Sequence, residues 1–309
     1  MISLNHVTKR YGKTVALSDV TLEVGKGETA GLLGRNGAGK TTALNLLTGF
    51  FPPDSGSVTV DGMDMLRRSR ECKRRIGYLP EQPPLYDEMT VRDYLSFVSD
   101  LREVMPGARN RHVDEILTLC GLRESAERVI GHLSKGFRQR VGIAQALCGN
   151  PEILIFDEPT VGLDPVQVVE IRNLIRQLGE DHTILFSSHI LSEVQQLCTT
   201  ALILHDGRLI RSFDMNHRDG LIRLELAAAG GEKEILSALR SLPSVRNIEK
   251  LSPEEPGTVH LRLTCQEKEE RGKTTDRIFY LLAALDTPIR KLTPEKNDLE
   301  DTFLRTIQE

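Results

Sequence analysis

The stretch Gly34-Arg35-Asn36-Gly37-Ala38-Gly39-Lys40-Thr41, followed by a second threonine at Thr42, decides the fold of this chain. It fits the phosphate-binding pattern G-x-x-x-x-G-K, followed by serine or threonine, at every fixed position. The apolar run at 29–33 predicts a buried strand before the loop, and the run at 43–47, ended by Gly49, predicts a helix after it. A strand, a glycine-rich loop and a helix are the context that this kind of phosphate site requires.

The chemistry of the loop follows from its backbone. Glycines allow several N–H groups to point into one concavity, and the helix N-terminus adds a partial positive charge. We expect Lys40 to reach the β- and γ-phosphates and Thr41 to offer its hydroxyl to Mg²⁺, a hard ion that prefers oxygen ligands. A glycine-rich turn that binds nothing is the alternative, and the flanking strand and helix favour the phosphate site.

Composition narrows the class of protein. The chain has 309 residues, which is enough for two domains. Its net charge is −4, so it lacks the excess of basic residues that would indicate nucleic acid as a partner. Its five cysteines lack metal-ligand spacing, which is typical of reduced thiols in a cytoplasmic protein. No segment approaches the about 20 apolar residues that cross a bilayer. We therefore expect any membrane role to come through a partner.

Short strands are expected at 2–4, 16–24 and 58–60, forming an antiparallel layer beside the nucleotide. Tyr11 falls in a turn between the first two, where it could stack on a base or be an ordinary turn residue. From 91 to 133 the apolar residues recur every three or four positions, which predicts a helical insertion in an α/β core.

A pair of acidic residues follows the continuous apolar run at 153–156. This run predicts a buried parallel strand that delivers Asp157 and Glu158 to its carboxyl end, where ligands bind in open α/β sheets. Asp157 can hold Mg²⁺, largely through water, while Glu158 can polarise or deprotonate the water that attacks a γ-phosphate. A helix at 165–178, a strand at 183–188 ending at His189, and a hairpin at 201–210 complete this domain near 213.

The remainder of the chain predicts a second, smaller domain without a chemical constellation. Its coarse order is βαββαβ, which resembles a ferredoxin-like module. The expected elements lie at 222–226, 232–242, 245–251, 258–263, 274–285 and 289–292, with a last helix at 299–306.

The stretch Leu133-Ser134-Lys135-Gly136-Phe137-Arg138-Gln139-Arg140, placed between the helical insertion and the Asp157-Glu158 strand, is the more specific motif. With it, the chain resembles the nucleotide-binding subunit of an ATP-binding-cassette (ABC) transporter, most closely the ABC-2 type of the drug-resistance, gliding-motility and copper-processing families. The resemblance implies an α/β P-loop NTPase cassette with a RecA-like core, an antiparallel β layer and a helical subdomain. The implied domains are a nucleotide-binding domain at 1–215, with its helical subdomain at about 90–135, and an α+β accessory domain at 220–309.

The resemblance also assigns residues. Glu158, His189 and Lys40 are implied to be catalytic, with Glu158 the catalytic glutamate and His189 the switch histidine that contacts the γ-phosphate. Magnesium is implied to be held by Thr41, Asp157 and Glu81, and residues 161–164 match the D-loop. The residues implied to bind ATP are Tyr11, Gly34, Asn36, Gly37, Ala38, Gly39, Lys40, Thr41 and Thr42, together with Ser134 and Gly136 acting on a partner's nucleotide.

Three departures from the family pattern stand out. Lys135 and Phe137 replace a glycine and the glutamine of the usual L-S-G-G-Q signature. An alignment without a gap places Glu81 at the usual Q-loop position, with Gln82 the alternative. Val161 stands where the D-loop often has serine.

The resemblance predicts an ATPase that forms a head-to-tail homodimer around two ATP and drives a separate membrane-spanning permease, leaning toward export. The permease would dock around residues 81–86 and the helical insertion, so the chain would be cytoplasmic and peripheral at the inner face of the cell membrane. The alternative is a soluble ABC ATPase that acts on ribosomes or DNA. The single cassette and the absence of a long heptad stretch or basic arm count against it. A regulatory subunit with little hydrolysis is a third hypothesis, prompted by Lys135, Phe137 and Glu81.

Overall fold

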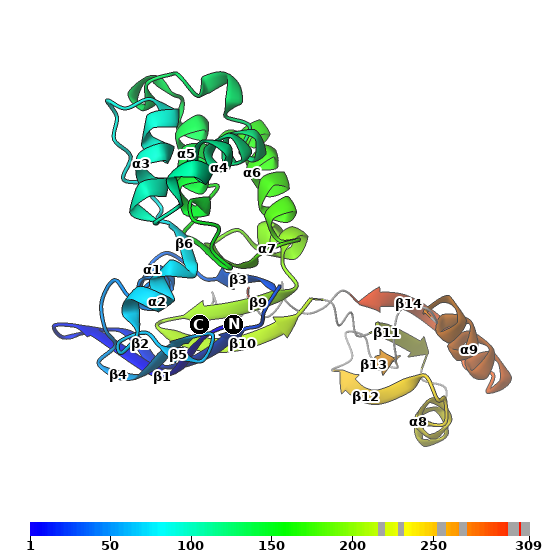
Figure 1. The fold of residues 1–309 in the computed structure, drawn as a ribbon. Coiled ribbons are helices and arrows are strands. Elements are labelled where there is room, and N and C mark those ends of the chain that lie inside the picture. Colours follow the sequence, from blue (N-terminus) through cyan, green and yellow to red (C-terminus); the bar gives the residue numbers. More distant parts are fainter. Residues whose placement is uncertain (216–219, 228–231, 252–257, 266–270, 296–302, 304–309) are drawn as a thin grey trace. The chain divides into compact units, whose positions relative to one another are not determined.

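The computed structural model of the chain describes residues 1–215, 220–227, 232–251, 258–265, 271–295 and 303 (Figure 1). By internal contacts the chain divides into two compact units, Met1–Phe213 and Asp214–Glu309. Each unit has its own hydrophobic core and is described by itself.

A six-stranded sheet forms the centre of the first unit. Its neighbouring strands pair in parallel from β6 through β7, β8 and β3 to β9, and β10 lies beside β9. Every residue of β3, β7 and β8 is buried, as expected of parallel strands covered on both faces. The strands predicted at 29–33, 153–156 and 183–188 are therefore confirmed. The strand order is β10 (Arg208–Asp214), β9 (Thr200–His205), β3 (Thr29–Leu33), β8 (Thr183–Ser188), β7 (Ile153–Phe156) and β6 (Ile76–Leu79).

An antiparallel sheet forms a second layer, and its order is β2-β1-β4-β5. Its buried residues, among them Ile2 and Leu4, share one core with Leu44 and Leu47 of the helix after the phosphate loop and with Ile155 of β7. The predicted antiparallel layer is confirmed, although its strands run further than their apolar stretches suggested. The strands are β1 (Ile2–Tyr11), β2 (Thr14–Val24), β4 (Ser55–Val60) and β5 (Met63–Asp64).

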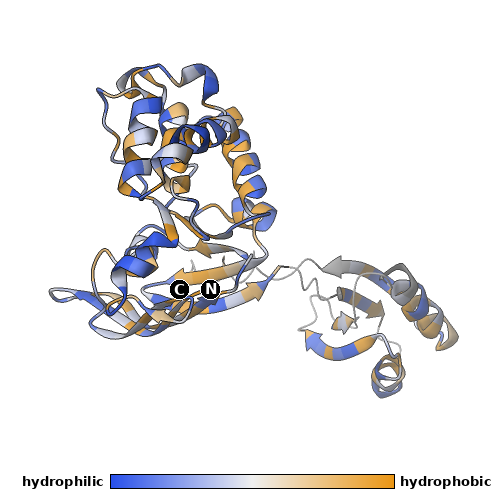
Figure 2. Cartoon of the chain, viewed as in Figure 1, coloured by the Kyte–Doolittle hydropathy of each residue, from blue (hydrophilic) through white to orange (hydrophobic). Residues whose placement is uncertain are grey.

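Helices make up the insertion and cover the sheet. Pro106 opens α4, where its fixed φ suits the first helical position and its missing N–H costs nothing. Figure 2 shows polar and apolar residues alternating along α6, whose buried side includes Ile171 and Ile175. The helices are α1 (Lys40–Leu47), α2 (Ser69–Arg74), α3 (Val91–Leu101), α4 (Pro106–Leu119), α5 (Lys135–Leu147), α6 (Pro165–Leu178) and α7 (Leu191–Leu197).

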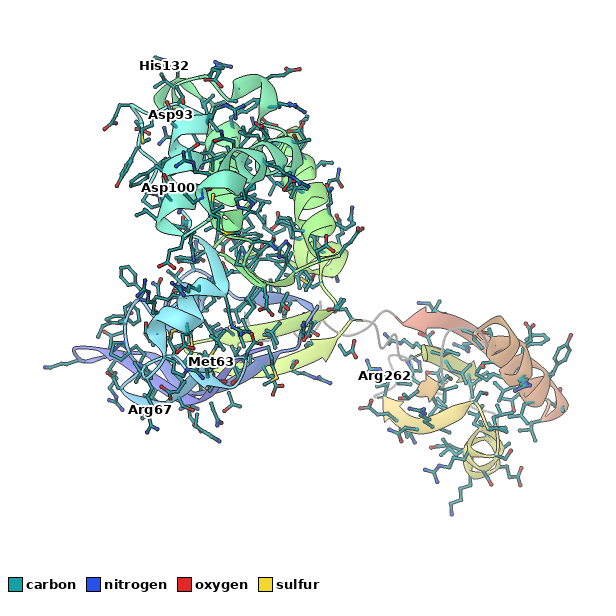
Figure 3. The ribbon with its side chains drawn as sticks, in the orientation of Figure 1. Met63, Arg67, Asp93, Asp100, His132 and Arg262 are labelled. Carbon is teal, nitrogen blue, oxygen red and sulfur yellow. The ribbon has the colours of Figure 1, made fainter. Side chains whose placement is uncertain are left out.

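An ion pair and a helix cap stabilise the first two helices of the insertion. Asp100, near the end of α3 in Figure 3, accepts two hydrogen bonds of 2.6 and 2.7 Å from the Arg109 guanidinium of α4. Asp93, labelled near the start of the same helix, donates its backbone N–H to the hydroxyl of the N-cap residue Thr90. The ion pair thus joins α3 to α4, and the cap stabilises the start of α3.

In its described residues, the second unit has a four-stranded antiparallel sheet and the helices α8 and α9. Leu224, Leu261 and Ile278 lie in its core. The predicted βαββαβ order is confirmed, whereas the predicted helix at 299–306 lies outside the described residues except for 303. The elements are β11 (Gly220–Ala227), α8 (Glu232–Arg240), β12 (Val245–Leu251), β13 (Thr258–Cys265), α9 (Arg271–Ala284) and β14 (Ile289–Glu295).

Within the described ranges, no helix combines the length and the apolar character needed to cross a bilayer.

Candidate nucleotide site

The glycine-rich loop between β3 and α1 is pressed against neighbouring backbone. A Cβ atom at Gly34 would lie 2.4 Å from the Leu204 carbonyl oxygen, and one at Gly39 would lie 2.6 Å from that of Ala16. Gly39 also has φ of 103°, in the left-handed region that favours glycine. No side chain caps the start of α1. Its first-turn N–H groups are therefore available to an anion.

Lys40 lies buried across this loop. Its ammonium donates hydrogen bonds to the carbonyl oxygens of Gly34 (2.7 Å) and Arg35 (3.3 Å). It is also 3.1 Å from Oε1 of Glu158, and this contact is an ion pair without hydrogen-bond geometry. The loop and the carboxyl end of β7 therefore meet at one buried lysine.

The two acidic residues after β7 occupy different surroundings. Asp157 is 1% exposed and accepts a hydrogen bond of 2.6 Å from the Ser187 hydroxyl of β8. The same hydroxyl accepts the backbone N–H of Glu158 at 2.9 Å. Glu158 has φ of 46°, a conformation that costs a non-glycine residue about 1–3 kcal/mol and is concentrated at functional sites. Ser187 thus holds the Asp157 carboxylate and the Glu158 backbone from the neighbouring strand.

His189 completes the group. Its Nδ1 atom is 2.9 Å from Oε2 of Glu158, and its side chain is 40% exposed. The contact follows from strand pairing, because β7 and β8 are parallel neighbours whose carboxyl ends lie together. The carboxylate of Glu158 therefore faces Lys40 with one oxygen and His189 with the other.

Two further predicted residues lie at the surface of the first unit. Tyr11 ends β1, is 48% exposed, and meets Phe51 edge-on with ring centroids 5.7 Å apart. Its ring is open to stacking, and its role stays a prediction. Glu81 and Gln82 both follow β6 as exposed residues, and the structure gives neither a hydrogen bond within residues 1–215. It therefore does not choose between them.

The signature stretch lies at the start of α5. Ser134 is its N-cap and accepts a long hydrogen bond of 3.5 Å from the Phe137 N–H. Gly136 is buried, and a Cβ atom there would lie 2.5 Å from the Gln167 side chain of α6. The signature is thus the first turn of a helix rather than a loop ahead of one. Within residues 1–215, no hydrogen bond or ion pair joins Ser134 or Gly136 to the loop 34–42.

The residues present suit Mg²⁺. Thr41 is exposed in the first turn of α1, and Asp157 supplies a carboxylate at the end of the adjacent sheet. Proteins commonly bind Mg²⁺ through one or two such ligands, with phosphate and water oxygens supplying the rest. In the part of the chain that the structure describes, no group of three or more histidine, cysteine or acidic side chains could hold an ion alone.

Sequence reasoning missed two polar contacts of the site. One is the double hydrogen bond of Ser187, for which the signal was a polar residue at the end of an apolar strand. The other is Tyr78 of β6, which donates to the Asn45 side chain of α1 at 3.3 Å. Burial, and to a lesser extent the nearby charge of Asp157, raises the pKa of the Tyr78 hydroxyl. That hydroxyl is a neutral hydrogen-bond donor at physiological pH.

Comparison with known proteins agrees with this geometry. Residues 17–161 match the ABC transporter family. The ABC transporter ATP-binding protein NatA of Bacillus subtilis (strain 168) is 41% identical over 216 residues, which cover 68% of this chain and 88% of that protein. The chain belongs to the ABC transporter family. It is one of the ATP-binding proteins, and the predicted resemblance and cassette fold are confirmed.

Other relatives of this ABC ATPase support the same conclusion. The bacitracin transport ATP-binding protein BcrA of Bacillus licheniformis is 38% identical over 219 residues, covering 70% of this chain and 71% of that protein. A solved dimeric structure of an ATP-binding cassette, in a post-hydrolysis state bound to ADP and Pi, has a TM-score of 0.64 and 27% identity. It covers 70% of this chain and 99% of that one. The chain is therefore a nucleotide-binding ATPase.

Proposed function

We propose that this chain hydrolyses ATP to drive a separate membrane-spanning permease, and that the transport is export. The observation that carries the proposal is the meeting of Lys40, Glu158 and His189 at the uncapped start of α1. A relative such as BcrA, named for bacitracin transport, supports a small-molecule exporter. The predicted ribosome- or DNA-associated alternative has no support among these relatives.

The proposed chemistry uses each residue in turn. The loop 34–42 binds the phosphates of ATP with its N–H groups, and Lys40 turns from Glu158 to the γ-phosphate. Glu158, released from that ion pair, orients and deprotonates the attacking water, while His189 contacts the γ-phosphate. Mg²⁺, held by Thr41 and Asp157 with Glu81 or Gln82, would neutralise charge on the phosphates. Tyr11 would stack on the base.

The proposed active form is a head-to-tail homodimer. Ser134 and Gly136 of one chain would bind the γ-phosphate that lies in the loop of the other. Gly136 and its N–H remain despite the departures at Lys135 and Phe137. Each chain would therefore supply half of each site.

A groove of about 830 Å³ beside α2 and α3 suits the permease. Exposed Tyr86, Phe97 and Leu101 line it, as do Arg70 and Arg74, whose guanidinium groups pair with Glu103. A short segment of the membrane partner with an apolar face would complement the apolar side chains. The chain would thus lie in the cytoplasm, at the inner face of the cell membrane.

The domains take corresponding roles in this proposal. Residues 1–215 form the nucleotide-binding domain, with the helical subdomain at about 90–135 as its permease-facing part. Residues 220–309 form an accessory domain.

The test replaces Glu158 with Gln in the full chain. Because a positioned general base contributes about 10²–10⁴-fold, ATP turnover should fall by at least about 100-fold, while ATP still binds and promotes dimerisation. Turnover is measured as phosphate release, and dimerisation by size-exclusion chromatography with ATP. Glu152→Gln, which changes an exposed carboxylate ahead of β7, is the matched control and should keep parental turnover.

Unchanged turnover in Glu158→Gln would overturn the assignment. A parental chain with negligible turnover, alone and with its permease, would instead support the regulatory-subunit hypothesis.

A further inference from the structure

Glu193 is a buried carboxylate that the proposed chemistry does not use. It belongs to α7, and it is 1% exposed. Its Oε1 accepts hydrogen bonds from the Thr160 hydroxyl at 2.7 Å and from the Arg172 guanidinium at 3.2 Å. Its Oε2 accepts a hydrogen bond from the Ser188 hydroxyl at 2.7 Å. A buried charge with three partners on three different elements fixes those elements relative to one another.

Two of these partners adjoin the nucleotide site. Thr160 comes two residues after Glu158 and directly before the D-loop residues 161–164, and the Val161 N–H donates to the Glu158 carbonyl at 3.1 Å. Ser188 directly precedes His189, and its hydroxyl accepts the Ile190 N–H at 3.0 Å. The Ser188 hydroxyl therefore links the Glu193 carboxylate to the residues on both sides of His189.

The contacts close a ring. Glu158 meets His189 through side chains, His189 follows Ser188 in the chain, Ser188 and Thr160 both bind Glu193, and Thr160 leads back to Glu158. The Ser188 carbonyl also accepts the N–H of Gly34, the first residue of the phosphate loop, at 3.3 Å. Moving either side of this ring would shift the atoms that face the γ-phosphate.

We infer that Glu193 is a positioning residue for hydrolysis, which holds His189 and the segment between Glu158 and the D-loop in one register. It does so without touching the nucleotide. This inference rests on the proposed roles of Glu158 and His189. A displacement of about 1 Å at a reacting group can cost about 100-fold in rate, so the effect of losing Glu193 should fall on turnover.

The test compares variants of the full chain by kcat, KM and nucleotide affinity. Glu193→Ala should lower kcat by about 10–100-fold, with ATP affinity within about threefold of the parent, since the phosphate loop is intact. Glu193→Gln keeps the size of the side chain and can still accept from Thr160 and donate to Ser188. It should recover most of the lost kcat.

Variants of the partners of Glu193 guard against a chain that fails to fold. Thr160→Val removes one bond of the ring, whereas Ser188→Ala removes the bond to Glu193 and also the acceptor of the Ile190 N–H. Both should lower kcat, and Thr160→Val is the cleaner test. Thr183→Val is the matched control, because it removes a partly buried hydrogen bond, from the Gly27 N–H at 2.9 Å, at the opposite end of β8. It should lower thermal stability by a similar amount and leave kcat unchanged.

Several results would overturn the inference. One is a kcat in Thr160→Val and Ser188→Ala that matches Thr183→Val at equal loss of stability. Another is a Glu193→Gln chain as inactive as Glu193→Ala. Glu158→Gln, measured in parallel, separates the two claims: if it is inactive while the ring variants are not, only the positioning role fails. If Glu158→Gln keeps full turnover, the proposed chemistry itself fails.

Discussion

The ion pair between Lys40 and Glu158 predicts that nucleotide binding must first break an interaction within the protein. Lys40 is 6% exposed and the Glu158 side chain 9% exposed, with 3.1 Å between the charged atoms. The perturbations are Lys40→Ala, Glu158→Gln and the two together, studied without nucleotide. Because the pair is buried, the two single changes should not be equivalent.

The expected magnitudes follow from what each change leaves behind. Lys40→Ala leaves a buried carboxylate whose remaining side-chain partner is His189, and breaking a buried pair from one side costs about 3–5 kcal/mol. Glu158→Gln leaves the ammonium with two carbonyl acceptors, so its cost should be nearer about 1–2 kcal/mol. The double variant removes both charges and should be more stable than the sum of the two losses by about 1–3 kcal/mol.

Chemical denaturation of the full chain, followed at the transition of the Met1–Phe213 unit, measures this coupling. In a unit of this size each kcal/mol also shifts the thermal midpoint by about 2–4 °C, so Lys40→Ala should melt roughly 10 °C lower. ATP should bind Glu158→Gln at least about fivefold more tightly than the parent, because 1 kcal/mol less must be spent on releasing Lys40. Losses that add to within about 0.5 kcal/mol, together with unchanged ATP affinity, would refute the reasoning.

Two more predictions concern groups outside the site. The thiols of all five cysteines are buried, and burial raises the pKa of Cys148 and of Cys265 from 9.0 to about 11. At pH 8 the native chain should react with a thiol reagent many times more slowly than the urea-unfolded chain, and rapid labelling of the native chain would contradict this burial. Hydrogen bonds from Arg74 and Arg70 lower the pKa of the Glu103 carboxyl from 4.5 to about 2. The stability that this carboxylate adds is therefore complete above about pH 4.5 and is lost as pH falls toward 2. The free energies of unfolding of Glu103→Gln and the parent should differ above about pH 4.5 and converge near about pH 2. A difference that stays constant with pH would exclude the pairing.

The elements that sequence predicted best are those buried on both faces. The strands β3, β7 and β8 keep the predicted bounds because an apolar run between two covering layers ends where the layers end. Helix α6 also keeps its bounds, set by Asp164 as N-cap and by Pro165 at the first position. By contrast, β1 continues past its apolar stretch, since pairing with two neighbours extends a strand through polar residues.

The sequence predicted those residues of the site whose positions follow from the ends of the parallel strands. Lys40, Asp157, Glu158 and His189 all follow or adjoin the carboxyl ends of parallel strands, which meet at one edge of the sheet. The ring through Glu193 was not predictable, because the partners of this α7 residue come from a loop, a strand and another helix that only tertiary packing brings together. Nor does sequence periodicity say that α5 begins at Lys135, since its apolar pattern starts only at Val141.

The geometry gives a reason why the proposed site should need two chains and should release them after hydrolysis. The starts of α1 and α5 each carry about half a positive charge, and neither is neutralised by an acidic residue in its first turn. In the proposed dimer both helix starts face the same γ-phosphate, and the exposed Lys135 ammonium adds to the positive side. The γ-phosphate balances these charges, so its departure leaves two positive helix ends opposed. The carboxylate of Glu158 also balances part of this positive charge, so the γ-phosphate contributes less to holding the dimer. Removing the carboxylate in Glu158→Gln should therefore lengthen the life of the ATP-bound dimer for an electrostatic reason as well as a catalytic one.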